Sequence, residues 1–303
     1  MVIMSIFSKF RVPVLAAVFG AMMVSGASLH VYAQGQKYLF LPNKPRPVQT
    51  SPFDLELIDV GVVKEIVKSD TLRLENGKTY KLDNIRVPIQ LDGAALDFLN
   101  KNVLGKKLGF YIVGKDPSAR ADHVGHILAH AVTREGEWLQ ALLVSRGLAW
   151  ANGSKDSRDL ILPLLKYEDL ARSQKLGLWQ SPDFSIKDNE TIMGDTRNSF
   201  QIFEGEIRSV SEKKDFAFYN FGKDPKTDFT IVINGKQVPQ FHLSDGRRTL
   251  APDEFKGKKI RIRGWVTENN GPMIELTYQE QIEFIDPLSA QIQYAPSDIW
   301  ARE

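Results

Sequence analysis

Apolar and polar residues alternate over residues 59–87 as two β-rich runs joined by a tight turn. The turn is Asn76-Gly77, and the residues on both of its sides alternate in character. Asn-Gly favours the two-residue turn of a β-hairpin because both positions accept a positive φ. The pattern therefore predicts a β-meander at the start of the first globular region.

Helical spacing appears next, over residues 93–179. Ala95, Phe98 and Leu99 fall on one face of a first helix. Glycine commonly ends a helix because it adopts the left-handed conformation easily, so we expect the helices to stop at Gly105, Gly147 and Gly177. The remaining expected elements are strands over 108–114 and 125–133 and helices over 136–147 and 160–179.

A second alternating region covers residues 200–285. Its aromatic and β-branched positions predict five strands, two of them joined by an Asn270-Gly271-Pro272 turn. Strands of this number and spacing suggest a small OB-like β-barrel. Polar segments with little periodicity flank it, so we interpret residues 181–199 as a linker and residues 286–303 as a tail.

The N-terminus predicts export. Lys9 and Arg11 precede an apolar core, Val12 to Val24, and small residues follow at cleavage spacing. Residues 1–33 therefore read as a signal peptide. Alternatively, Val12 to Ala33 stays uncleaved as an anchor, since it can cross a hydrocarbon core of about 30 Å at about 1.5 Å per residue. Either way the remaining chain is expected outside the cytoplasm, periplasmic or held at the inner membrane, after a proline-bearing linker over residues 34–54.

Composition narrows the class of protein only slightly. The 303 residues are 43% hydrophobic and 25% charged, enough for real cores. The net charge of +2 neither requires nor excludes an anionic partner, so a nucleic-acid site must rest on local patches. Cysteine is absent, which excludes disulfides and thiolate chemistry.

Five motifs in this order resemble the staphylococcal nuclease (thermonuclease) family over about residues 57–180. They are "SDTLRL", "YKLDNIRVP", "DHVGHILAH", "WLQALLVSRGLA" and "LARSQKLGLW". The resemblance implies a mainly β fold with α-helices, an OB-type barrel over residues 55–180. Residues 200–285 also resemble a module found behind some bacterial thermonuclease-like domains, which implies binding rather than catalysis.

The family resemblance further implies a calcium ion held by two aspartates and a backbone carbonyl, a glutamate that positions water, and two arginines that grip phosphate. In this sequence the first aspartate is matched by Asp70 and the second by Arg86. The glutamate is matched by Ile89, and the two arginines by Lys81 and His126. We therefore expect no catalytic residues, no metal and no cofactor at this site.

Two consequences follow from Arg86. The cation of Arg86 would repel a divalent ion at this site. Separately, Ile89 cannot act as a base, so no side chain at that position activates the attacking water. We also expect Asp70 and Arg86 to pair directly in place of the metal. The alternative is a rebuilt calcium-dependent phosphodiesterase, for which the candidate second carboxylates are Asp83, Asp92 and Asp122.

His123, His126 and His130 are close in sequence and raise the question of a zinc site. On a helix the last two would form an i, i+4 pair. The segment reads as a strand, where they stand roughly 13 Å apart at about 3.3 Å per residue. We therefore favour ordinary barrel or surface histidines.

A basic stretch in the second region is a candidate binding site for a polyanion or single-stranded nucleic acid. OB barrels bind such ligands through basic grooves with aromatic platforms. The candidate residues are Lys258, Lys259, Arg261, Arg263, Tyr219 and Phe221. The alternative is a solvated basic strand edge that resists edge pairing, with Trp265 in the core.

These patterns together favour an exported thermonuclease-like protein that has lost nuclease activity and acts as a binding or scaffold component of the cell envelope. A rebuilt metal-dependent nuclease and an accessory subunit of a membrane complex are the alternatives. The expected partners are an envelope protein or a polyanion, with membrane contact through Val12 to Ala33 if that segment stays uncleaved.

Overall fold

The structure is a computed structural model of the chain. It describes Pro52, Ser157 and residues 55–153, 160–189, 196–213, 215–224, 227–234, 255–268 and 270–285. The predicted signal or anchor segment, nearly all of the 34–54 linker and the C-terminal tail lie outside these residues. Within the described ranges, every helix is too short or too polar to cross a membrane.

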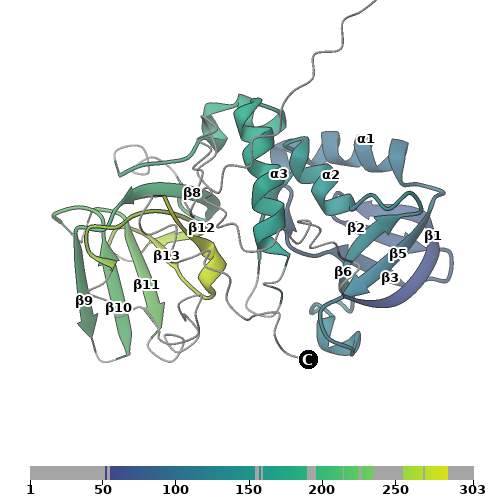
Figure 1. The fold of residues 1–303 in the computed structure, drawn as a ribbon, viewed down its shortest axis with the longest axis horizontal. Coiled ribbons are helices and arrows are strands. Elements are labelled where there is room, and N and C mark those ends of the chain that lie inside the picture. The colour runs from purple at the N-terminus through teal and green to yellow at the C-terminus, as the bar shows by residue number, and fades with distance from the viewer. Residues whose placement is uncertain are drawn as a thin grey trace, which may run out of the picture. The chain divides into compact units, whose positions relative to one another are not determined.

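Five strands of the first region close into a barrel in the order β1-β2-β3-β6-β5 (Figure 1). They are β1 (Glu56–Lys68), β2 (Thr71–Leu74), β3 (Thr79–Leu82), β5 (Lys107–Ile112) and β6 (Ile127–Thr133). The predicted hairpin between β2 and β3 is confirmed, but its loop spans the four residues 75–78 and only Gly77 takes a positive φ, of 85°. The Asn76 side chain accepts a bond from the backbone N–H of Lys78 at 3.0 Å. The parallel pairing of β3 with β6 completes the closure.

Three helices accompany the barrel, as the apolar spacing predicted. They are α1 (Asp92–Asn102), α2 (Leu139–Ser145) and α3 (Ile161–Ser173). The first and third end before the glycines expected to stop them. Gly177 instead begins the 3-10 turn η4 (Gly177–Gln180) and lies against Gly147. A Cβ added to Gly147 would come within 2.1 Å of the Leu176 carbonyl oxygen. Only glycine fits that crossing.

The interior of the barrel is apolar and aromatic. Leu72, Leu82 and Phe110 point inward and are fully or almost fully buried. The rings of Tyr80 and Phe110 stack with centroids 4.2 Å apart. Leu99 of α1 joins the same core, which explains the helical spacing of its apolar residues. Packing of one strand face against the helices therefore fixes the barrel.

The second region is β-rich, as predicted, and its strands form a seven-stranded sheet. They are β8 (Ser199–Glu206), β9 (Ser209–Lys213), β10 (Phe216–Asn220), β11 (Thr230–Asn234), β12 (Lys259–Glu268), β13 (Pro272–Glu275) and β14 (Ile282–Phe284). Their order is β14-β12-β13-β11-β10-β9, and β8 pairs with β12. Closure into an OB-like barrel stays a prediction. A stacked pair, Phe203 and Phe229, lies in the core of this sheet with centroids 3.9 Å apart.

A buried ion network joins α3 to β12 and β14. Nη1 of Arg263 lies 2.8 Å from Glu168 Oε2 and donates to the carbonyl of Ala151 at 3.0 Å. Nη2 of Arg263 lies 2.7 Å from Glu283 Oε1. The three charged side chains are almost completely removed from water. A charge buried this deeply persists only when it is paired.

Candidate functional site

The five positions matched to the family's site come from separate elements near the β1–β2 turn. Asp70 lies in that turn and Lys81 on β3. Arg86 ends β4 (Ile85–Arg86), a two-residue strand that pairs with β7 (Trp150–Ala151). Ile89 begins the 3-10 turn that follows, and His126 directly precedes β6.

Asp70 is held by neighbours other than a metal. Its Oδ1 accepts a bond from the Thr71 hydroxyl at 2.7 Å, and its Oδ2 lies 3.7 Å from Nζ of Lys81. Lys81 also lies close enough to Asp122 to lower the pKa of that carboxyl. A lysine therefore stands between two of the carboxylates that could have approached one ion.

Asp122 anchors the loop before β6. Burial opposes its ionisation, but backbone N–H bonds from His126 and Val124 and the nearby charges of His126 and Lys81 bring its pKa below the ordinary value. Nδ1 of His126 lies 3.3 Å from Oδ2 of Asp122. His126, at the position of the family's second arginine, thus contacts the carboxylate that anchors this loop.

The other two carboxylates proposed for a rebuilt metal site have partners of their own. Asp83 is buried and pairs with Arg120, while Asp92 accepts a bond from the Ser69 hydroxyl. No cluster of three or more potential metal ligands occurs within the described part of the chain. Calcium requires six to eight oxygens at about 2.3 to 2.6 Å. The donor set therefore does not fit the family's calcium ion.

Arg86 does not pair with Asp70, so the prediction of a direct ion pair is wrong. No nitrogen of Arg86 lies within 4.0 Å of the Asp70 carboxylate. The guanidinium instead stacks over Trp265, 4.5 Å from the ring centroid, and lies 5.8 Å from that of Phe200. Burial lowers the pKa of Arg86, and the charge of Asp70 opposes this shift. Cation–π attraction thus replaces the expected salt bridge.

Arg86 and Trp265 should show measurable coupling. A double-mutant cycle on urea midpoints with Arg86→Ala and Trp265→Ala should give a coupling of about 0.5 to 1 kcal/mol, because Trp265 is 43% exposed and the contact is only partly desolvated. Arg146 stacks on Phe98 elsewhere in the barrel and is the matched control. Arg146→Ala should be additive with Trp265→Ala. Additivity of the Arg86 cycle as well would contradict the stacking.

The position of the family's glutamate is open and apolar. Ile89 is 80% exposed, and Gln90 beside it is also exposed. Neither side chain can take a proton from water at neutral pH. The absence of a catalytic base at this site stays a prediction.

The histidines do not form a cluster. β6 begins at Ile127, so the helical i, i+4 spacing does not apply to His126 and His130. His130 is buried beside Trp138, with ring centroids 5.5 Å apart, whereas His123 is exposed. The interpretation as ordinary barrel and surface histidines is consistent with this placement.

The predicted polyanion site requires correction. Arg261 and Arg263 are only 2% and 0% exposed, because the face they share meets carboxylates rather than solvent. Arg261 contacts Glu204 and lies 3.3 Å from Glu283. The predicted platforms are wrong as well, since Tyr219 and Phe221 belong to the core of the sheet. Of the predicted set, only Lys258 and Lys259 keep access to solvent.

The sequence analysis did not identify the residues that contact Arg86 and Arg263. Burial of Trp265 in the core was the alternative to an exposed position beside the basic stretch; the residue is 43% exposed and is the partner of Arg86. Glu168 lies on the buried face of α3, and this was a readable signal, because a glutamate inside an apolar helical stripe requires a buried cation. Glu283 gave no comparable signal.

A closed five-stranded barrel with α-helices defines the OB-type fold of the nuclease class. Residues 89–181 match the family described as "Staphylococcal nuclease homologue", so this part of the chain is a staphylococcal-nuclease-like domain. The match runs from the turn at Ile89 through α3 and η4. A comparison with curated proteins gave no match.

Proposed function

We propose that this protein is an exported thermonuclease-like protein without nuclease activity, which acts as a binding or scaffold component of the cell envelope. The proposal rests on the residue found at the position of the family's second metal-binding aspartate. Its position holds Arg86, and that arginine is engaged with Trp265 of β12. The position is thus used for packing.

The chemistry supports the same conclusion. Metal-assisted phosphodiester cleavage requires a bound cation to stabilise developing charge and a positioned, activated water. Here Lys81 lies beside the remaining aspartate, Asp70, and an exposed isoleucine, Ile89, stands where the base would be. The matched positions therefore provide neither a second metal-binding carboxylate nor a base to activate water. A rebuilt nuclease site therefore has no observation in its favour.

The envelope location rests on the sequence of residues 1–33. Positive residues before an apolar run support a location of the following domains outside the cytoplasm. If Val12 to Ala33 remains uncleaved, the protein becomes a tethered accessory subunit of a membrane complex. Nuclease-like domains are related to nucleic-acid binders, so a polyanion stays a candidate ligand beside an envelope protein.

The first test is a cleavage assay. Protein lacking residues 1–33 should leave single-stranded DNA and RNA intact in calcium, because it lacks the carboxylate pair and the base. Arg86→Asp combined with Ile89→Glu restores the family's acidic residues and should raise calcium affinity, measured by calorimetry. Cleavage by the unaltered protein that disappears on Asp70→Ala would refute the proposal.

The binding role needs its own test. Full-length protein should retain a stable partner when isolated from solubilised envelopes, and a protein carrying residues 1–33 alone fused to an unrelated domain is the control. A partner retained by the full chain and absent from the control supports the scaffold role. Recovery of the full chain free of any partner or polyanion would count against it.

A further inference from the structure

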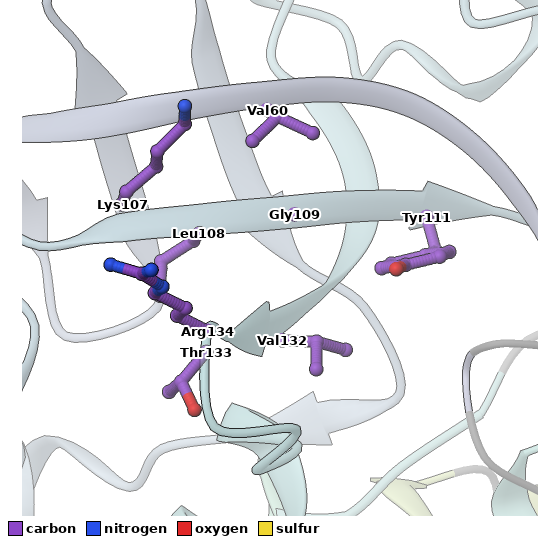
Figure 2. A pocket seen from close by; sticks show the side chains of 8 residues that line it. All are labelled: Val60, Lys107, Leu108, Gly109, Tyr111, Val132, Thr133 and Arg134. Carbon is purple, nitrogen blue, oxygen red and sulfur yellow. The ribbon is translucent and has the colours of Figure 1, made fainter.

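A groove of about 510 Å³ lies on the barrel across β1, β5 and β6 (Figure 2). Val60 of β1 and Val132 of β6 both pair with Gly109 of β5, so three neighbouring strands contribute one residue each to its floor. Val60 precedes Asp70 by ten residues, roughly 30 Å of extended strand at about 3.3 Å per residue. The lining of the groove contains none of the five positions matched to the family's site, so binding there does not depend on whether that site has lost its activity.

The floor of the groove is aliphatic and partly open to solvent. Val60 is 48% exposed, whereas Val132 is 2% exposed and forms the base. Gly109 carries no side chain, and a Cβ there would come within 3.1 Å of Cε2 of Tyr111. The glycine therefore leaves room for the tyrosine ring, which borders the groove on one side.

Two cations lie at the other end. Figure 2 shows the side chains of Lys107 and Arg134 on the side of the groove away from Tyr111. Neither has an ion-pair partner within 4.0 Å in the part of the chain that the structure describes. Both side chains are exposed. This contrasts with Arg261 and Arg263, whose charges are neutralised internally.

We propose that this groove binds a small amphiphilic anion. A carboxylate or phosphate head group would meet Lys107 and Arg134, where charge-assisted hydrogen bonds are available. Its aliphatic tail would lie over Val60, Gly109 and Val132 towards Tyr111, removing apolar surface from water. A cleft of about 300 to 1,000 Å³ with an apolar lining and few polar groups is the usual form of such sites.

The lining favours an aliphatic ligand over a nucleic acid. Single strands bind to extended basic grooves with successive aromatic platforms. This groove offers one aromatic ring, Tyr111, and its apolar lining is otherwise aliphatic. The separation of charge at one end from apolar surface along the floor matches one head group and one tail.

Titration calorimetry with decyl phosphate below its micelle concentration tests the site. The intact protein should bind one molecule, and inorganic phosphate and decanol should each bind at least about tenfold more weakly, since each supplies half of the interaction. Lys107→Ala and Arg134→Ala should each weaken decyl phosphate binding about tenfold. Lys101→Ala, an exposed lysine on α1, is the matched control and should leave binding unchanged.

The variants should fold, because both cations are exposed and unpaired in the described structure, and unchanged urea midpoints will verify this. Val60→Asp provides a second probe by placing an anion in the aliphatic floor, and it should also weaken binding about tenfold. Equal decyl phosphate affinity in the intact protein and the Lys107→Ala, Arg134→Ala double variant overturns the proposal. The proposal is also overturned if a single-stranded oligonucleotide binds the intact protein, loses that binding in the double variant, and is not displaced by decyl phosphate.

Discussion

Arg263→Ala should lower the free energy of unfolding by about 3 to 5 kcal/mol, measured from urea midpoints. The substitution leaves the buried Glu168 without its cation, and it leaves Glu283 with Arg261 alone, at 3.3 Å. It also removes the donor to the Ala151 carbonyl. Burial alone would lower the pKa of Arg263, but the two carboxylates hold it above its ordinary value, so the guanidinium stays charged at every accessible pH.

A surface pair provides the control for this prediction. Arg197 and Glu268 are 3.0 Å apart and exposed, and Arg197→Ala should cost about 0 to 1 kcal/mol. Replacing Arg263, Glu168 and Glu283 together by apolar residues should cost less than Arg263→Ala alone, because no buried charge is then left unpaired. A loss below about 1 kcal/mol for Arg263→Ala would contradict the network.

The protein should lose about 3 kcal/mol of stability between pH 7 and pH 4 through His130 alone. Burial, assisted by the charge of Arg120 and opposed by that of Asp83, lowers the pKa of His130 to about 4. In the unfolded chain its pKa is about 6.5. Below pH 6.5 the unfolded state takes up a proton that the folded state refuses, so stability falls until about pH 4 and is fully present above pH 6.5.

His130→Leu isolates this effect. The variant lacks the titrating ring and should show a smaller decline in urea midpoint between pH 7 and pH 4 than the unaltered protein, by about 3 kcal/mol. His126→Gln changes a partly exposed histidine and should keep the decline. Identical pH profiles for the unaltered protein and His130→Leu would show that His130 is not the group responsible.

Local features of the barrel were predictable from the sequence. Asn76-Gly77 set the hairpin because the turn chemistry is contained in two residues. Ala95 and Leu99 gave the buried face of α1 because one helix satisfies the spacing by itself. Gly105 and Gly177 were less accurate as stops, since the helices end in ordinary residues before each.

The second region shows where period-two reasoning reaches its limit. Residues 216–221 read Phe-Ala-Phe-Tyr-Asn-Phe, so aromatic side chains occupy both faces and the pattern cannot choose the buried one. The structure buries Tyr219 and leaves Phe216 exposed. For β12 the alternation was correctly read, but the face bearing Arg261 and Arg263 meets acids from distant parts of the chain.

The candidate site was predictable in its chemistry and not in its contacts. A cation at Arg86 and an apolar side chain at Ile89 follow from the sequence alone. The partner of Arg86 does not, because Trp265 belongs to another sheet and stands apart from any motif. From the sequence, Arg86 was expected to pair with Asp70. In the structure it stacks instead on Trp265, which is distant in the sequence.

The separation of Glu168 from Arg263 along the chain has a consequence for biosynthesis. The two residues are 95 positions apart, so α3 emerges from the ribosome long before its counter-charge exists. Until β12 and β14 arrive, the last helix of the barrel carries a carboxylate destined for an apolar environment. The buried network around Arg263 therefore forms only after the chain has been made as far as Glu283.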